Sequence, residues 1–312
     1  MRIMLTGASG FLGARLARTL IARGVDEVLS LGRRASDVAG VRNLVTPDFS
    51  REALTRTLGD VRFDALFHLA AAGVHPADRD AATLFETNTC VPARLVAFTQ
   101  RAGARAIVIA GSSAEYRQPA SATPVLESDA METERAYGAS KAAGSMLALA
   151  QGAASGIPVA VLRMFNLYGP GEASHRLFRA LHDGLGTGRR VPLSAGTQIR
   201  DFVQVDDACD GLLLALGTLL DGTMPSGAYN LASGIGCSVA DFARMTARAM
   251  RADESLIDFG ALPMRPDDLP YLVGDATRLH RSTGWVPRRT LTLGLAQSLA
   301  EMPQPNLLNG RG

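Results

Sequence analysis

The chain has 312 residues, 47% of them hydrophobic and 20% charged, and its formal net charge is +2. These values are typical of a soluble globular protein with one large domain or two, and they give no indication of binding to nucleic acid or to a membrane surface. The three cysteines lie far apart without a CxxC pair, and we find neither a signal-peptide pattern nor an apolar run of the ~18 residues that cross a membrane. We therefore expect a cytoplasmic protein with no metal site.

The first 23 residues follow the strand–turn–helix order of a dinucleotide-binding fold. Residues 2–6 form a short apolar run, glycines follow at 7, 10 and 13, and a helical pattern opens at Phe11. Gly7 permits a tight turn, Gly10 lets the backbone approach a pyrophosphate at the positive helix end, and Gly13 allows close packing of helix on strand. The spacing is GxxGxxG rather than GxGxxG, and a purely structural turn is the alternative. The predicted cofactor contacts here are Gly7, Gly10, Phe11, Leu12 and Gly13.

The second predicted strand, residues 27–31, indicates which dinucleotide is bound. Folds that prefer NAD carry an Asp or Glu near this point to accept from the ribose 2′-hydroxyl. Here Gly32 takes that place, and Arg33 and Arg34 follow. Because an Arg fork matches a 2′-phosphate, we predict NADP(H) rather than NAD(H). The alternative is a solvated loop in which the arginines touch nothing.

Two further strands and their loops complete the predicted cofactor site. After a short strand at residues 44–46, Asp48 could accept from the adenine amino group while Phe49 flanks the ring; a plain turn is the alternative. Residues 65–71 form the fourth strand, in which His68 is predicted to be a packed strand-end residue. Small side chains after it let backbone lie against a flat cofactor. The predicted contacts are Asp48, Phe49, Leu69, Ala70 and Ala71.

The next elements predict the fold class. A long helix at residues 83–101 contains Asn88, which we include among the cofactor contacts, and residues 107–110 form a fifth strand. Strands that alternate this regularly with helices indicate an α/β fold with a doubly wound parallel sheet. Ser112 and Ser113 follow the fifth strand, at the carboxyl edge where such sheets bind ligands.

Tyr137 and Lys141 are spaced i, i+4 in a stretch with a helical apolar stripe. On a helix this spacing places the two side chains next to one another on one face. An ammonium near a phenol favours the phenolate, so such a Tyr can exchange a proton near neutral pH. An ordinary surface pair one turn apart is the alternative.

Eight motifs follow one another along the chain. They are TGASGFLG at residues 6–13, HLAA at 68–71, GSSAEY at 111–116, YGASK at 137–141, RMFNLYGPG at 163–171, RDFVQVDD at 200–207, YNLASG at 229–234 and RPDD at 265–268. In this order they resemble the extended short-chain dehydrogenase/reductase family, the NAD(P)-dependent nucleotide-sugar epimerases, dehydratases and reductases. The resemblance covers nearly the whole chain.

The resemblance implies a catalytic set of Ser112, Tyr137 and Lys141. Ser112 would hydrogen-bond the reacting sugar oxygen, Tyr137 would be the acid or base, and Lys141 would bind the nicotinamide ribose and tune the Tyr. Tyr137 and Lys141 are therefore cofactor contacts as well.

The resemblance also implies substrate contacts, which we assign to Ser113, Asn166, Arg200 and Arg265. The two arginines occupy positions that commonly meet the nucleotide diphosphate, consistent with Arg as a bidentate anion binder. For Arg200 the alternative is an ion pair between domains.

Within the family, the chain most resembles the GDP-4-keto-6-deoxy-mannose reductases, through GSSAEY, FNLYGPGE and residues 265–287. It departs from the family at Arg117, where Gly is usual, at Gln204, where His is common, and in the stretches 73–80 and 89–92. Arg117 and the 73–80 loop are expected near the sugar pocket, so the identity of the hexose stays open.

The family pattern also implies the domain organisation. We predict a dinucleotide-binding domain of residues 1–165 and 200–232 and an interleaved nucleotide-sugar-binding domain of residues 166–199 and 233–302. Within the second, residues 177–185, 239–250, 276–283 and 290–300 read as helices, and Asp206 is a candidate cap for a helix running to residue 220. Residues 303–312 form a polar tail.

The predicted function is reduction of a nucleotide-linked 4-keto-(6-deoxy)hexose, with hydride from NADPH to C4 and a proton from Tyr137. The same residues would serve a nucleotide-sugar 4-epimerase, and a non-catalytic NADP-binding sensor is the alternative from another class. A dehydratase is disfavoured because such enzymes carry an acidic pair directly after the catalytic Ser or Thr. The family usually forms homodimers through two long helices, here residues 83–101 and 135–155. The base, the hexose and the stereochemistry at C4 are left open.

Overall fold

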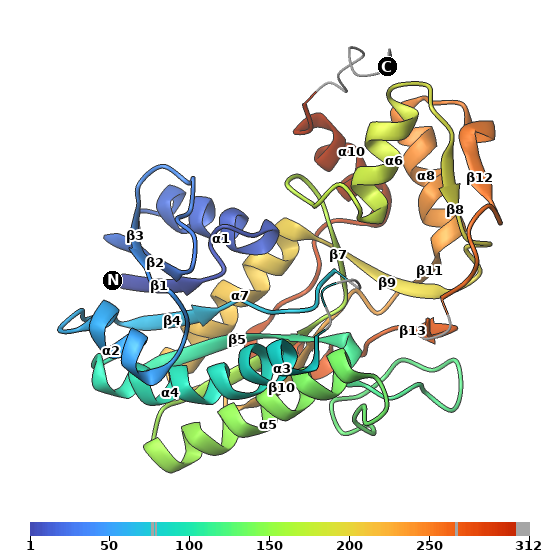
Figure 1. The fold of residues 1–312 in the computed structure, drawn as a ribbon. Helices are drawn as coiled ribbons and strands as arrows, with labels where there is room; N and C mark the ends of the chain where they lie inside the picture. Colours follow the sequence, from blue (N-terminus) through green and yellow to red (C-terminus); the bar gives the residue numbers. More distant parts are fainter. Residues whose placement is uncertain (76–77, 79, 266–267, 304–312) are drawn as a thin grey trace.

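The computed structural model describes residues 1–75, 78, 80–265 and 268–303. Within these residues, seven parallel strands form a sheet in the order β10-β6-β5-β4-β1-β2-β3 (Figure 1). The strands are β1 (Arg2–Thr6), β2 (Glu27–Gly32), β3 (Val41–Val45), β4 (Ala65–His68), β5 (Ala106–Ser112), β6 (Val159–Met164) and β10 (Gly227–Leu231). Strand order reverses between β1 and β4, so the sheet is doubly wound, as the sequence predicts.

Helices cover both faces of this sheet because its central strands are apolar on both sides. One face packs against α1 (Phe11–Ala22) and α7 (Val205–Leu220), through a core that includes Leu16, Leu20 and Leu212. The other face packs against α2 (Arg51–Leu58), α4 (Val91–Arg101) and α5 (Ala136–Ser155). Figure 1 shows α4 and α5 running side by side below the sheet.

The predicted boundaries of several elements in this lobe were wrong. The third strand comprises Val41–Val45 rather than residues 44–46, and the fifth extends through Ser112. The fourth strand ends at His68 rather than at residue 71. The Leu69 N–H donates to the Thr6 carbonyl at 3.2 Å, the last bond of the pairing with β1. The N–H groups of Leu69 and Ala70 also donate to the Thr6 hydroxyl, each at 3.2 Å, so the chain turns away there.

The predicted helix 83–101 is interrupted in its middle. It consists of α3 (Ala81–Leu84), a π-helical turn η2 (Phe85–Cys90) and α4. Pro92 has no N–H to donate to the carbonyl of Asn88 four residues earlier, so the regular ladder cannot pass through this point. The freed Asn88 carbonyl faces Gly144 of α5.

A smaller lobe contains the strands β7 (Asn166–Tyr168), β9 (Ile199–Gln204), β11 (Gly236–Ser238) and β13 (Tyr271–Leu272), which pair around β9, and a separate pair, β8 (Val191–Leu193) with β12 (Ile257–Phe259). Its helices are α6 (Leu177–Leu185), α8 (Val239–Met250) and α10 (Leu291–Ala300), and their core is aromatic, with Phe202 stacked on Phe242 at 4.0 Å between ring centroids. Short helical segments η3 (Ser113–Glu115), η4 (Glu254–Leu256) and α9 (Thr277–Thr283) complete the described elements.

The chain passes between the lobes more than once. It leaves the large sheet after β6, returns with α7 and β10, and leaves again at β11. Residues 200–204, predicted to belong to the first domain, pair only with strands of the smaller sheet, so the return begins at α7. The division into two domains otherwise stays a prediction.

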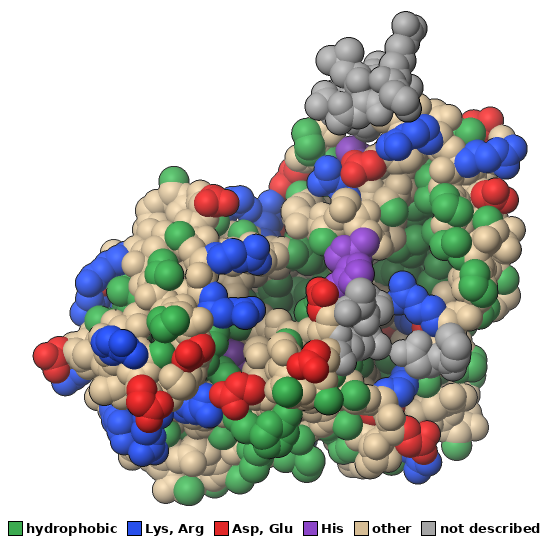
Figure 2. Space-filling model, in the orientation of Figure 1, with side chains coloured by type: hydrophobic (Ala, Val, Ile, Leu, Met, Phe, Trp, Pro, Cys, Tyr) green, Lys and Arg blue, Asp and Glu red, His purple; other side chains and the backbone are tan. Residues whose placement is uncertain are grey.

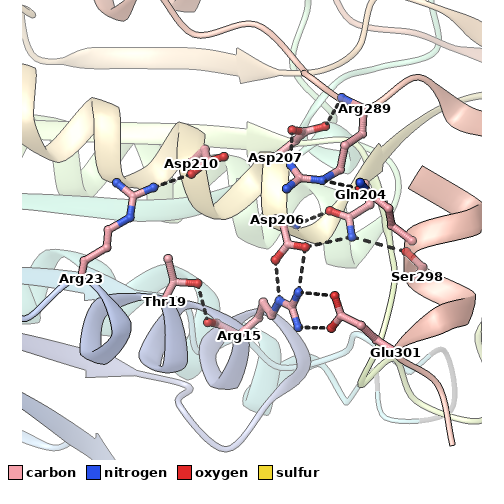
Figure 3. Close-up of polar contacts among 11 residues, drawn as sticks. Arg15, Thr19, Arg23, Gln204, Asp206, Asp207, Asp210, Arg289, Ser298 and Glu301 are labelled. Carbon is pink, nitrogen blue, oxygen red and sulfur yellow. Dashed lines mark hydrogen bonds and ion pairs between the residues drawn. The ribbon is translucent and has the colours of Figure 1, made fainter. Parts of the chain in front are cut away.

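A charged cluster joins α1 to α7 and α10 (Figure 3). Arg15 donates to Asp206 at 2.8 Å and to Glu301 at 2.6 Å. The prediction that Asp206 caps α7 was wrong: the cap is Gln204, whose side-chain oxygen accepts from the Asp206 N–H, and the Asp206 carboxylate binds Arg15 instead. The helix that follows the glycine turn is thereby tied to the C-terminal helix.

No helix in the described ranges is both long and apolar enough to cross a membrane. Within the same residues, no group of three or more His, Cys, Asp or Glu side chains lies close enough together to hold a metal ion. Cys209 is buried, whereas Cys90 and Cys237 are half-buried.

Candidate active site

A cavity of about 1040 Å³ lies at the carboxyl ends of β1, β2, β4 and β5. Most of the predicted cofactor and catalytic residues line it: Gly7, Gly10, Phe11, Leu12, Gly13, Arg33, Arg34, Asp48, Phe49, Leu69, Ala70, Ala71, Ser112, Tyr137 and Lys141. The structure therefore brings together residues that are more than 130 positions apart in sequence, at the edge where doubly wound sheets bind ligands.

The glycine turn has the shape that a dinucleotide needs. Gly7 has a φ of 75°, and a Cβ there would lie 2.8 Å from the backbone nitrogen of Ala70. A Cβ on Gly13 would lie 2.1 Å from the Gly7 carbonyl oxygen, so the first turn of α1 packs directly on the loop. Gly10 is the N-cap of α1 and supplies no side-chain cap. The N–H groups at this helix end are thus available to an anion, and the residues fit a bound pyrophosphate.

At the end of β2, Gly32 is followed by the exposed Arg33 and Arg34, which line the cavity. Neither forms an ion pair with any described residue. Asp48 also lines the cavity, while its carboxylate accepts from the Ser50 N–H at 2.7 Å. This end of the cavity therefore carries two arginines where an NAD-type site would carry an acid.

The first turn of α5 presents the predicted catalytic pair. Tyr137 is half-buried on the cavity wall, and Lys141 is buried one turn further on, with Nζ donating to the Ala110 carbonyl at 2.7 Å. Burial lowers the pKa of Lys141, and the nearby Glu115 carboxylate opposes that shift. The helix is held close because a Cβ on Gly138 would lie 2.1 Å from the carbonyl oxygen of Ala114.

Two predicted contacts do not line the cavity. Asn88 is buried behind it, where its side chain accepts from the Ala72 N–H at 2.8 Å and donates to the Ala72 carbonyl at 3.1 Å and to Ser140. Ser113 is the first residue of η3 and is also buried. Asn88 therefore holds the loop that follows β4, a role that the local sequence does not indicate.

The prediction that His68 is a packed residue is confirmed. It is 1% exposed, and its Nδ1 lies 2.7 Å from the Thr6 hydroxyl. Burial, together with the charge on Lys141, lowers the pKa of His68 to about 3, so the ring is neutral at pH 7.

A second cavity of about 740 Å³ adjoins the first, between the two lobes. It is lined by three of the predicted substrate residues, Asn166, Arg200 and Arg265. Arg200 is buried and pairs with Asp268, and burial lowers its pKa while that carboxylate opposes the change. The arginine charge on this wall suits an anionic ligand.

The wall between the two cavities contains residues that our sequence predictions missed: Val74, Leu167, Glu172, His175 and Arg176 line both. The rings of His75 and His175 lie 4.4 Å apart between centroids, edge to face. Figure 2 shows histidine at the centre of the viewed face, over the hollow between the lobes. Burial raises the pKa of Glu172 to about 7, opposed by its ion pair with Arg176 at 3.2 Å. The only sequence signal near these residues is the YGPGE stretch at residues 168–172, which contains Glu172.

The departures from the family pattern fall mostly away from the cavities. Arg117 was expected near the sugar pocket, but it is exposed, pairs with Glu134 at 2.8 Å and lines neither cavity. Gln204 caps α7, and residues 89–92 lie at the η2–α4 junction. The 73–80 loop includes residues 76, 77 and 79, which are outside the described ranges.

A parallel sheet, an uncapped glycine turn and a Tyr–Lys pair at its carboxyl edge define a dinucleotide-dependent enzyme of the Rossmann type. The chain belongs to the NAD dependent epimerase/dehydratase family, whose model matches residues 3–232. It is 32% identical to a UDP-glucose 4-epimerase of Azospirillum brasilense, over 95% of this chain and 90% of the relative. It is 29% identical to a dTDP-6-deoxy-L-talose 4-dehydrogenase (NAD(P)(+)) of Kitasatospora kifunensis, over 93% and 92%. Among solved structures it resembles MoeE5 in complex with UDP-glucose and NAD, with a TM-score of 0.84, 27% identity and coverage of 96% and 98%.

Proposed function

We propose that the protein reduces the C4 carbonyl of a nucleotide-linked 4-keto-(6-deoxy)hexose with NADPH. One observation carries the proposal: the cavity that contains Ser112, Tyr137 and Lys141 adjoins a second cavity lined by arginines, and the two share a wall. A dinucleotide in the first cavity and a sugar nucleotide in the second would meet where the two join. Val74 and Leu167 at that junction offer an apolar surface suited to a deoxy carbon.

When bound, the nicotinamide supplies the hydride. The chain's own residues do the rest: Ser112 holds the C4 oxygen, Tyr137 donates a proton to it, and the ammonium of Lys141 favours the ionised form of Tyr137 after transfer. Asn166 contacts the sugar, and Arg200 and Arg265 bind the diphosphate. Because Arg200 already pairs with Asp268, its guanidinium can be presented to a phosphate only by sharing or releasing that carboxylate.

The preference for NADPH rests on the end of β2. Gly32 leaves no acid to hold a ribose 2′-hydroxyl, and Arg33 and Arg34 are exposed there without an ion-pair partner among the described residues. Replacing both arginines with Ala is expected to weaken NADPH binding while leaving NADH binding nearly unchanged, as measured by titration of cofactor fluorescence. An unaltered ratio of the two affinities would refute the assignment.

A nucleotide-sugar 4-epimerase is the second candidate, favoured by the 32% identity to a UDP-glucose 4-epimerase. It would use the same residues, with Tyr137 first removing a proton and hydride later returning to the other face of the sugar. The GDP-4-keto-6-deoxy-mannose substrate, suggested by residues 265–287, is one choice within the reductase proposal. A dehydratase is not supported, because Ser113 and Ala114 follow Ser112 and the next acid, Glu115, is fully buried and lines neither cavity.

We also propose a homodimer formed through α4 and α5. The exposed apolar side chains Phe85, Met146 and Leu147 lie on this layer, being 62%, 55% and 48% exposed. Figure 2 shows apolar side chains gathered along the lower edge of the molecule, where Figure 1 places α5. The expected result of Met146→Glu with Leu147→Glu is a halved mass in light scattering.

The test of function is NADPH consumption by the purified protein against a panel of GDP- and dTDP-linked 4-keto-6-deoxyhexoses. Stoichiometric consumption supports the reductase, whereas interconversion of UDP- or GDP-hexoses on a catalytic trace of cofactor supports the epimerase. Tyr137→Phe should keep cofactor binding and lose about 10²–10⁴-fold in rate. Unchanged activity in that variant would overturn the role of Tyr137, and cofactor binding with no turnover on any sugar would favour the sensor.

A further inference from the structure

Lys141 is the only lysine among the chain's 32 basic residues; the others are arginines. The distinction matters because a guanidinium stays charged in proteins, whereas a buried ammonium can lose its proton. Lys141 is 5% exposed, and its ammonium donates to the Ala110 carbonyl near the end of β5. Burial alone disfavours its charged form, so something in its surroundings must keep it protonated if it is to act on Tyr137.

Glu115 is the acid on the other side of the same strand end. It is fully buried and projects from η3, directly after β5. One carboxylate oxygen, Oε1, accepts from the Ser112 N–H at 2.9 Å, and the other, Oε2, accepts from Arg163 Nε at 2.9 Å. Glu115 thus binds the backbone of Ser112, two residues along β5 from the Ala110 carbonyl that Lys141 binds.

The position of this carboxylate is fixed from several directions. Arg163 also donates to the Tyr116 hydroxyl at 2.9 Å and to the Glu127 carbonyl at 3.1 Å, and its guanidinium lies 4.7 Å from the centre of the Tyr116 ring. The Tyr116 hydroxyl donates in turn to Asn230 at 2.5 Å. A Cβ on Gly111 would lie only 2.8 Å from Glu115 Oε1. The carboxylate is therefore held against the end of β5 by a hydrogen bond on each oxygen and by its close contact with Gly111.

We propose that Glu115 is a positioning residue that keeps Lys141 protonated and fixes the backbone of Ser112 at the reacting edge. The catalytic roles of Ser112 and Lys141 rest on the function proposed above. The effect of Glu115 on the charge of Lys141 can be tested without that function. A buried ion pair with Arg163 that serves only stability is the competing explanation.

The charged groups around Lys141 leave Glu115 as the stabilising anion. Lys141 is approached by His68 from β4, which is neutral at pH 7, by Tyr137 on its own helix and by Glu115 from η3. Glu115 itself is shared between Lys141 and Arg163. Removing its charge should therefore make Lys141 easier to deprotonate, while removing the charge of Arg163 should have the opposite effect.

The chain provides a matched control in Glu132. It is another buried carboxylate, 5% exposed, that pairs with an arginine, Arg135, and accepts backbone N–H groups next to α5. Its carboxylate accepts from N–H groups of the residues that precede α5, rather than at the end of β5 where the Lys141 ammonium binds. Glu132→Gln thus removes a comparable buried ion pair without removing an anion that acts on Lys141.

The experiment uses protein labelled with ¹³C or ¹⁵N lysine, which gives a single side-chain signal whose pH titration reports Lys141 directly. In Glu115→Gln we expect the midpoint to fall by about one pH unit or more, with no shift in Glu132→Gln. Glu115→Asp, which retains the charge, should restore most of the midpoint. If Glu115→Gln titrates as the wild type does, the proposal is wrong. If that variant does not fold, Arg163→Gln decides, because the midpoint must then rise.

A second readout separates this inference from the proposed function. With a substrate from the sugar panel, the alkaline limb of kcat/KM against pH should move down in Glu115→Gln by the same amount as the lysine midpoint. A shifted midpoint in a protein that turns over no sugar supports the inference and refutes the function. An active enzyme whose midpoint and pH profile are both unmoved refutes the inference and leaves the function intact.

Discussion

Gly144 offers the sharpest test of how closely α5 packs on the interrupted helix. A Cβ at this position would lie 1.9 Å from the Asn88 carbonyl oxygen and 2.9 Å from the Asn88 carbonyl carbon. Both are backbone atoms of η2, so no side chain can swing aside to make room. Because favourable carbon–oxygen contacts are roughly 3.5 Å, the helix must move by more than an ångström to accommodate an alanine.

The magnitude follows from two opposing effects. Over-packing of a rigid interface costs about 1–3 kcal/mol, whereas replacing a helical Gly with Ala gains about 0.5–1 kcal/mol. We expect Gly144→Ala to lose about 1–2 kcal/mol of unfolding free energy, a fall in Tm of about 2–6 °C. The displaced Asn88 also holds the Ala72 loop, so cofactor binding should weaken as well.

The matched control is Gly217→Ala, in α7. No atom lies within 4 Å of the Cβ that this substitution adds, so only the helical gain of about 0.5–1 kcal/mol remains. The assay is thermal unfolding followed by circular dichroism, with both variants measured beside the wild type at one protein concentration. Gly217→Ala should raise Tm and Gly144→Ala should lower it. A Gly144→Ala protein as stable as the wild type would refute the packing argument.

Two further predictions concern charged groups. Burial raises the pKa of Glu172 in the folded protein to about 7, from an ordinary 4.5, so its stabilising contribution is complete below pH 4.5 and is lost as the pH rises through 7. Glu172→Gln should therefore be more stable than the wild type at pH 8, by at most about 3 kcal/mol, and equally stable at pH 4. Urea unfolding at both pH values measures the difference. Arg15→Ala removes one partly buried ion pair, with Asp206, and one exposed pair, with Glu301, and should cost about 1–2 kcal/mol, less in high salt. Arg23→Ala removes one exposed pair and should cost under about 0.5 kcal/mol. Equal costs for the two arginine variants would show that the Arg15 cluster contributes no more than a surface pair.

The sequence predicted the local parts of the site well. The glycine turn was placed correctly because strand, turn and helix are contiguous there. The positive φ of Gly7 and the close contact of Gly13 with the Gly7 carbonyl are requirements set within a few residues. The bounds of α6 and α8 agree with the predicted ranges for a similar reason: their apolar stripes are strongly periodic, and Ser238 caps α8. Lys141 was located by its spacing from Tyr137 together with the YGASK motif that the chain shares with the family.

What the sequence missed depends on contacts between distant segments. The end of β4 is set by the hydroxyl of Thr6, 62 positions away from His68. Asn88 was expected to face the cofactor, but only the packing of η2 on α5 decides that it faces the Ala72 loop. Arg117 turns outward because Glu134 pairs with it there. A pattern read along one chain gives the residue types that meet a ligand, but not which side of a loop each will occupy.

Glu115 is a further example of a residue whose direction the sequence pattern did not predict. Ser113, directly after Ser112, is buried and lines neither cavity. Glu115, at the end of η3, points into the core and meets Arg163, so this acid is out of reach of a sugar. The sequence indicated that a dehydratase acid was missing without indicating what the remaining acid does.

The pairing of β10 with β6 has a consequence for how the protein is made. β10 is an edge strand of the large sheet and pairs with β6. The chain between these two strands contains β7, α6, β8 and β9 of the smaller lobe and all of α7. Until residue 231 has left the ribosome, the edge of β6 has no partner, and a fragment of residues 1–165 would keep that edge bare permanently. Exposed apolar edges of this kind promote aggregation, and such non-local pairing slows folding. The cofactor-binding lobe is therefore not expected to fold as an independent N-terminal unit.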